Sequence, residues 1–118
     1  MQDDVLFSYF TVEEALLFAA KLKLRTSIQH KIMRVKQIAD DLGLNHCLKT
    51  PIGSVLKKTI SGGERKRVSI GVELVTDPSL IVLDEPTSGL DSFRATGICK
   101  ILHTLAREKG KTIIAAIH

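Results

Sequence analysis

The sequence predicts an α/β fold in which a parallel sheet is joined to a separate group of helices. Two short apolar runs, 80–83 and 113–117, flank a segment with helical spacing, the pattern of a strand-helix-strand unit. Such units form parallel sheets with a right-handed crossover. Upstream, residues 11–75 carry serine or threonine caps followed by helical periodicity, so we expect this part to be helical.

Composition limits the classes of protein that the chain can belong to. Its 118 residues allow at most one ordinary domain, and 44% hydrophobic residues support a buried core. The net charge of +4 is modest and its basic residues lie among acids, so we expect no nucleic-acid-binding surface. No apolar run reaches the roughly 20 residues of a membrane helix. Cys47 and Cys99 lack zinc-site spacing, and we expect both to be reduced packing residues.

The first helices are predicted from their caps. Thr11 and Glu14 have the spacing of a capping box, which predicts a helix over residues 12–25. Ser27 can cap a second helix, which we expect to end at Gly43 because glycine is the usual helix stop. Residues 44–58 are expected to be irregular.

The second half of the chain begins with another capping-box spacing, Ser61 and Glu64, which predicts a helix up to the break at Asp77-Pro78. The later elements are a strand at 80–83 covered on both faces, a helix at 92–108 and a second buried strand at 112–117.

Paired acids follow the first predicted strand, at the edge where open α/β sheets bind ligands. Asp84 would hold Mg²⁺, because this hard cation prefers oxygen ligands. Glu85 would instead polarise an attacking water, as a positioned carboxylate does in phosphoryl transfer. The alternative interpretation is an acidic turn that binds nothing.

A serine and two glycines begin the helix that precedes this strand. Gly62 and Gly63 leave room for a phosphate to approach the backbone N–H groups, and Ser61 adds a hydroxyl donor. The alternative is an ordinary helix cap after a flexible joint. The basic residues 65–67 are expected on the exposed side of this helix.

Other polar residues give weaker signals. His118 should emerge on the same sheet edge as the two acids, because parallel strands align their carboxyl ends. Asp91 could simply be the neighbour of a helix cap. Three further histidines have no matching partners and are expected to be surface or packing residues: His30, His46 and His103.

Together these motifs resemble the ATP-binding domains of ABC transporters. Residues 60–64 are similar to the signature motif, 80–85 to the Walker B strand, 88–91 to the D-loop, Gln2 to the Q-loop glutamine and His118 to the switch histidine. The sequence of residues 62–71, with Glu64 in place of the commoner glutamine, resembles that of the G subfamily of half-transporters.

The resemblance implies a P-loop NTPase-like fold and divides the chain into three parts. These are a Q-loop region at 1–10, a helical subdomain with the signature helix at 11–75, and a Walker B, D-loop and switch-histidine part of the α/β core at 76–118. It also implies an ATPase on the cytoplasmic face of a membrane, which couples hydrolysis to export of a lipid, sterol, pigment precursor or drug-like substrate. The implied partners are a second ATP-binding domain, paired head to tail, and a transmembrane domain in the same full-length chain.

The family also assigns roles to individual residues. ATP would be contacted by Gln2, Ser61, Gly62, Gly63, Glu64 and Asp91, and Mg²⁺ by Asp84 and Gln2. Glu85 would be the general base and His118 would contact the γ-phosphate. Ser61 and Gly63 would serve the nucleotide of the neighbouring domain, whereas the acids would serve the nucleotide of their own.

One departure from the family pattern is the absence of a G-x-x-x-x-G-K-[ST] sequence, the phosphate loop known as Walker A. We therefore expect a partial cassette that binds ATP poorly and does not turn it over when isolated. Two alternatives stay open. One is a non-catalytic module that pairs with a full-length partner, and the other is a soluble ABC-type ATPase acting on nucleic acid or ribosomes.

Overall fold

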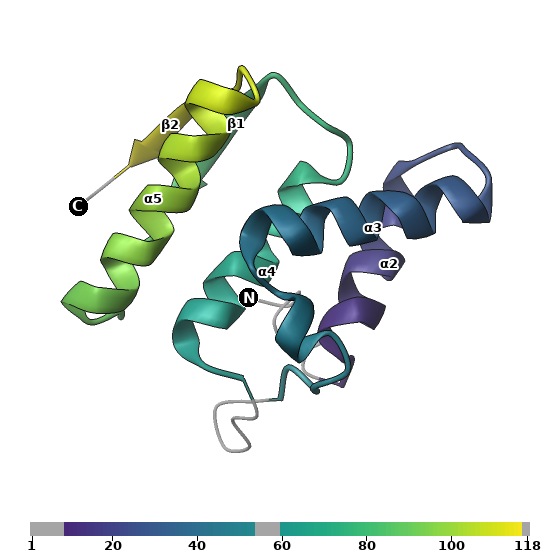
Figure 1. Ribbon diagram of the computed structural model, residues 1–118, viewed down its shortest axis with the longest axis horizontal. Coiled ribbons are helices and arrows are strands. Elements are labelled where there is room, and N and C mark those ends of the chain that lie inside the picture. Colours follow the sequence, from purple (N-terminus) through teal and green to yellow (C-terminus); the bar gives the residue numbers. More distant parts are fainter. Residues whose placement is uncertain (1–8, 54–59, 117–118) are drawn as a thin grey trace.

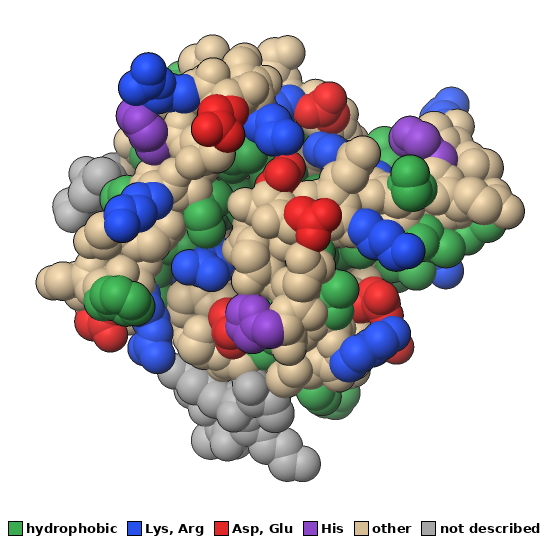
Figure 2. Space-filling view, in the orientation of Figure 1, with side chains coloured by type: hydrophobic (Ala, Val, Ile, Leu, Met, Phe, Trp, Pro, Cys, Tyr) green, Lys and Arg blue, Asp and Glu red, His purple; other side chains and the backbone are tan. Residues whose placement is uncertain are grey.

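A computed structural model gives the fold of residues 9–53 and 60–116. In chain order the elements are α2 (Val12–Lys23), α3 (Ile28–Leu42), the 3-10 turn η1 (Asn45–Cys47), α4 (Gly62–Leu74), β1 (Leu80–Asp84), α5 (Ser92–Glu108) and β2 (Thr112–Ala116). Helices α2, α3 and α4 pack together, and α4 also contacts the unit formed by β1, α5 and β2 (Figure 1). Among the helices of these described ranges, none is long and apolar enough to cross a membrane. On the face seen in Figure 2, Lys and Arg side chains are interspersed with Asp and Glu side chains.

The helix boundaries follow the predicted caps. Thr11 accepts a hydrogen bond from the N–H of Glu14, whose carboxylate in turn accepts one from the N–H of Thr11. This capping box starts α2 where the sequence predicts, and the helix ends at Lys23, two residues before the expected end. Helix α3 ends at Leu42 and is capped by Gly43, which has a φ of +66° and so adopts the left-handed conformation that glycine favours.

Helix α4 ends at Leu74 without a glycine stop. Its last carbonyls are satisfied from another helix, because Arg34 of α3 donates from Nη2 to the Leu74 oxygen (2.6 Å) and from Nε to the Val75 oxygen (3.2 Å). Asp77 follows with a φ of +53° and forms ion pairs with Arg34 and Lys111. These contacts fix the C-terminus of α4 to α3 and to the residue before β2.

The predicted strand-helix-strand unit is confirmed. Strands β1 and β2 are parallel, with Leu80 opposite Thr112 and Asp84 opposite Ala116. Ile81 and Leu83 of β1 belong to the same core as Ile98 of α5.

Two predictions are wrong for this structure, namely that β1 is covered on both faces and that β2 is buried. In β1, Ile81 and Leu83 are buried, whereas Val82 between them is 64% exposed. Strand β2 is mostly exposed, including Ile114. The burial of β1 alternates because the described helices pack against only one face of this sheet.

Candidate functional site

The N-terminus of α4 carries the serine and the glycine pair. Ser61 is the N-cap, and its hydroxyl oxygen accepts a hydrogen bond from the N–H of Glu64 (3.0 Å). The Glu64 carboxylate accepts one from the N–H of Ser61 (2.9 Å), so the predicted capping box is present. An α-helix leaves its first N–H groups without partners inside the helix, and this box satisfies those of Ser61 and Glu64.

The N–H groups of the two glycines have a different environment. Within residues 9–53 and 60–116, neither Gly62 nor Gly63 donates a backbone hydrogen bond. Both groups lie in the first turn of α4, where the helix dipole favours an anion. The cap itself therefore gives neither N–H group a partner. Gly62 is half-buried beside the Ser61 cap, and Gly63 is buried beside Arg94, so an anionic ligand would approach this turn from the side of Gly62.

The segment that follows β1 lies against this turn. A methyl group on Gly62 would stand 3.4 Å from Leu90 Cδ2, and one on Gly63 would stand 3.4 Å from Arg94 Cδ. The glycine pair and the 88–91 motif, which are well separated in sequence, are thus neighbours in space. The contact of Arg94 was not predicted, since no local pattern connects it to Gly63.

The expectation that residues 65–67 lie on the exposed side of α4 is wrong, because all three are half-buried. Arg65 donates to the carbonyl oxygens of Ile52 (3.0 Å) and Gly53 (3.1 Å). In the described part of the chain, the buried Nε of Arg67 has no hydrogen-bond partner. Helix α4 contacts α2 and α3 as well as β1 and α5, which leaves little of its surface to solvent.

The two acids lie at the carboxyl end of the sheet, as the sequence predicts. Asp84 is the last residue of β1, and its side chain is exposed. It helps to line a cleft of about 340 Å³ that also borders Lys66 and Val82. Asp84 therefore lies beside a cleft, where its carboxylate could help to hold a hydrated cation.

Glu85 begins the turn after β1 with an unusual backbone. Its φ is +48°, a region that non-glycine residues rarely adopt and that often occurs at functional sites. Three hydrogen bonds hold it: its N–H donates to the Ala116 oxygen (2.7 Å), and its oxygen accepts from the Ser88 N–H (3.1 Å) and Lys66 Nζ (3.4 Å). The last bond connects this turn directly to α4.

Asp91 is itself the cap of α5, not merely its neighbour. Its Oδ1 accepts a hydrogen bond from the Arg94 N–H (2.8 Å), and its Oδ2 lies 3.7 Å from the Arg94 guanidinium. Gly89 precedes it with a φ of +75°, which explains the glycine in this turn. Gln2 and His118 lie outside the described residues, so their roles stay predictions.

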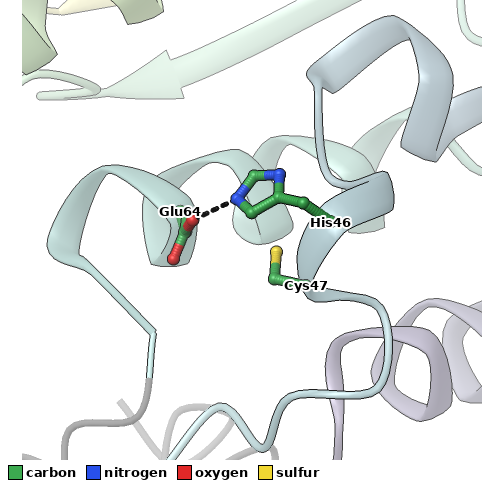
Figure 3. Close-up of side chains that lie close together, drawn as sticks. All are labelled: His46, Cys47 and Glu64. Atoms are coloured by element: carbon green, nitrogen blue, oxygen red, sulfur yellow. Dashed lines mark hydrogen bonds and ion pairs between the residues drawn. The ribbon is translucent and has the colours of Figure 1, made fainter.

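A further contact was missed by the sequence analysis. His46, expected to have no matching partner, lies with its Nε2 2.5 Å from Oε2 of Glu64 (Figure 3). The pKa of Glu64 is held below its ordinary value chiefly by the hydrogen bond from the Ser61 N–H, with a further contribution from His46.

Cys47 adjoins this pair and is buried, as predicted. Burial raises the pKa of its thiol, and the nearby Glu64 carboxylate adds to the effect. Cys99, by contrast, is exposed, so the prediction that it is a packing residue is wrong. It occupies the solvent-facing side of α5, whereas Ile98 faces the core.

The fold and these motifs define an ATP-binding domain of the ABC type, made of a helical subdomain and part of a parallel sheet. Comparison with known sequences agrees, because the ABC transporter family profile matches residues 1–88. The chain therefore belongs to the ABC transporter family.

The relatives point to one branch of that family. ABC transporter G family member 22 of Arabidopsis thaliana is 50% identical over 99% of this chain, and member 16 is 49% identical over 100% of it. Similarity to the G subfamily, inferred above from residues 62–71, is thus confirmed. The chain spans only 16% of the length of these two relatives.

Solved structures support the fold. The structure of cbiO1 from Clostridium perfringens, part of the ABC transporter complex cbiONQ, matches 98% of this chain and 45% of its own length, with a TM-score of 0.80 and 31% identity. An inward-facing metal-chelate type ABC transporter matches 92% of this chain and 43% of its own, with a TM-score of 0.75 and 25% identity.

Proposed function

We propose that this chain forms part of the ATP-binding domain of a G-type ABC transporter that couples ATP hydrolysis to export. The observation that carries the proposal is the capped N-terminus of α4, where the cap leaves the Gly62 and Gly63 N–H groups as donors. Lipids, sterols, pigment precursors and drug-like compounds are the substrate classes that the G-type resemblance suggests. The working unit would be a pair of such domains attached to a transmembrane domain at the cytoplasmic face of a membrane.

The N-terminus of α4 would contact the nucleotide held by the second domain. The Ser61 hydroxyl already accepts a hydrogen bond from Glu64, and a hydroxyl has one donor and two acceptor positions. Its O–H can therefore donate to a phosphate oxygen while the cap stays intact. Together with the Gly63 N–H, it would supply fixed donors where negative charge accumulates, the main way in which proteins assist phosphoryl transfer.

The acids would serve the nucleotide of their own domain. ATP would supply the phosphate bond that is hydrolysed, and Mg²⁺ would neutralise part of the charge of its phosphates. Asp84 would help to hold this cation, because its carboxylate lies exposed at the end of β1. Glu85 would act as general base on the attacking water, with its backbone fixed by the bonds to Ala116 and Ser88. Gln2 and His118 would complete this half of the site as metal ligand and γ-phosphate contact.

Turnover would further require a phosphate loop, which the sequence of this chain does not contain. We therefore propose that the chain alone binds ATP weakly and does not hydrolyse it. The same observation favours a second candidate function, in which the chain pairs with a complete ATP-binding domain and modulates it. Co-purification with such a domain, together with a change in its rate of ATP turnover, would support this second function.

The test uses the complete transporter that contains this segment, purified as its dimer. Glu85→Gln is expected to reduce ATP turnover about 100-fold or more, the usual cost of losing a general base. Ser61→Ala removes a hydrogen bond to a charged group and should reduce turnover at least about tenfold. The matched control is Ser69→Ala, since Ser69 is an exposed serine of the same helix. Wild-type turnover in Ser61→Ala would refute the proposed function of the α4 N-terminus, and wild-type turnover in Glu85→Gln would refute the proposed general base.

A further inference from the structure

The contact between His46 and Glu64 joins the turn η1 to the first turn of α4. The two residues are 18 positions apart, and the imidazole approaches the carboxylate from the side of α4 that faces η1 (Figure 3). The His46 side chain is 61% exposed, whereas that of Glu64 is only 22% exposed. An exposed imidazole therefore contacts a largely covered carboxylate of the signature motif.

The two oxygens of Glu64 have separate partners. Oε1 accepts from the Ser61 N–H at 2.9 Å, and Oε2 faces His46 Nε2 at 2.5 Å. An ionised carboxylate only accepts hydrogen bonds, so the imidazole donates through its Nε2–H. With both oxygens engaged, the carboxylate cannot rotate about its last bond without losing a partner. The two contacts thus bracket the carboxylate between η1 and the cap residue Ser61.

The turn η1 holds His46 firmly. Leu44 and Cys47, on either side of it, are buried. The Leu44 oxygen accepts hydrogen bonds from the Cys47 N–H (3.1 Å) and from the Cys47 thiol (3.4 Å). His46 therefore projects from a fixed turn.

The same three side chains could instead be considered as metal ligands, since their donor atoms lie within 4.8 Å of one another. The hydrogen bonds argue otherwise. The Cys47 thiol donates to the Leu44 oxygen, and burial raises the pKa of this thiol, which opposes the thiolate that a metal requires. Glu64 already has a partner at each oxygen. The cluster is a satisfied hydrogen-bond network.

We propose that His46 is a positioning residue that orients the Glu64 carboxylate and thereby holds Ser61 and the Gly62 and Gly63 N–H groups for phosphate binding. This inference rests on the proposed function of the α4 N-terminus. His46 touches no nucleotide in this account and acts only through Glu64. A side chain that donates one hydrogen bond from the same place should replace it, whereas an apolar side chain of similar size should not.

The first test measures the contact without nucleotide. In the chain itself, the pKa of Glu64 is followed through its carboxyl ¹³C signal, together with the amide signal of Ser61. His46→Leu is expected to raise the pKa of Glu64 and displace the Ser61 amide signal, because one donor to the carboxylate is lost. His46→Gln should preserve the Ser61 amide signal and retain part of the lowering of the Glu64 pKa, since its amide N–H can donate but carries no charge. His103→Leu is the matched control on an exposed histidine of α5.

The second test measures ATP turnover in the complete transporter. His46→Leu should reduce kcat about tenfold, since a misplacement of roughly 1 Å can cost up to 100-fold, and His46→Gln should restore it. Equal turnover in wild type and His46→Leu, or an unchanged Glu64 pKa, would overturn the positioning role. Ser61→Ala in the same assay separates the two ideas, because wild-type turnover in that variant would refute the proposed function itself. Thermal unfolding of each variant verifies that the fold is kept.

Discussion

Gly71 lies where the three helices α2, α3 and α4 meet, and its replacement by alanine is a sharp test of this packing. A methyl group at Gly71 would stand 2.9 Å from Leu16 Cδ2, 3.0 Å from Ile38 Cγ2 and 3.1 Å from Leu42 Cδ1. All three neighbours are almost fully buried, at 0%, 1% and 0% exposure. They have little room to move, so the added methyl group must push helices apart.

Two opposing effects set the magnitude for Gly71→Ala. Overpacking a core costs about 1–3 kcal/mol, and contact with three buried side chains places this site near the upper end. Alanine in a helix interior is favoured over glycine by about 1 kcal/mol. The net loss in the free energy of unfolding should therefore be about 2 kcal/mol, or a fall of about 8 °C in Tm for a chain of this size.

Urea unfolding followed by circular dichroism measures this loss, and Gly97→Ala provides the matched control. Gly97 is also inside a helix, but a methyl group there would meet only the tip of Arg67, at 3.1 Å from Nη2. That tip is the end of a flexible side chain, so the helix preference should prevail and leave Gly97→Ala as stable as wild type or more so. If Gly71→Ala also proves as stable as wild type, the account of how α4 packs on α2 and α3 is refuted.

Three further predictions concern single side chains. Iodoacetamide should modify Cys99 much faster than Cys47, because only Cys99 is exposed; equal rates by mass spectrometry would contradict the burial of η1. The folded-state pKa of Glu64 lies below its ordinary 4.5, so its carboxylate stabilises the fold above that pH, and this contribution is lost as the pH falls through the folded value. In Glu64→Gln, the urea midpoint of unfolding should therefore fall less steeply as the pH is lowered below 4.5. The same pH dependence in wild type and variant would count against the role of Glu64 in the cap. The pKa of Asp77 is lowered mainly by its hydrogen bond from Lys111. The Asp77 carboxylate therefore also stabilises the fold above its ordinary pKa of 3.8, and this contribution is lost as the pH falls through the lower folded value. Asparagine tolerates the left-handed backbone of residue 77, so Asp77→Asn should lose stability at neutral pH only through the lost ion pairs. This loss should be smaller in 1 M salt, which screens charges. Equal stability of Asp77→Asn and wild type at low salt would disprove the prediction.

The features that could be predicted from the sequence are those encoded by residues close together in the chain. The caps at Thr11, Ser27 and Ser61 depend on contacts three residues away, so spacing alone identifies them. The stop at Gly43 depends on the conformational freedom of one residue. The placement of the acids after β1 follows from the apolar run before them.

The features that were missed depend on distant parts of the chain. The pairing of His46 with Glu64 exists only because the turn η1 folds back on α4. The burial of Arg65 likewise requires the carbonyls of residues 52 and 53 to lie beside α4. Periodicity also cannot show how many layers cover a strand, which is why Val82, in a continuous apolar run, proved to be exposed.

The central claim is that the acids and the glycine turn of one chain belong to two different nucleotide sites. Mixed dimers of the complete transporter test this directly with Ser61→Ala and Glu85→Gln. If the claim is correct, placing the two changes on opposite chains damages a single site and leaves the other intact. Placing both on one chain then damages both sites.

The measurement is the rate of ATP hydrolysis by the two mixed dimers, purified with different tags on the two chains. The account predicts that the dimer with the changes on opposite chains retains the higher rate, up to that supported by its intact site. A higher rate for the dimer with both changes on one chain would contradict it, because Ser61 would then serve the same nucleotide as Glu85 of its own chain.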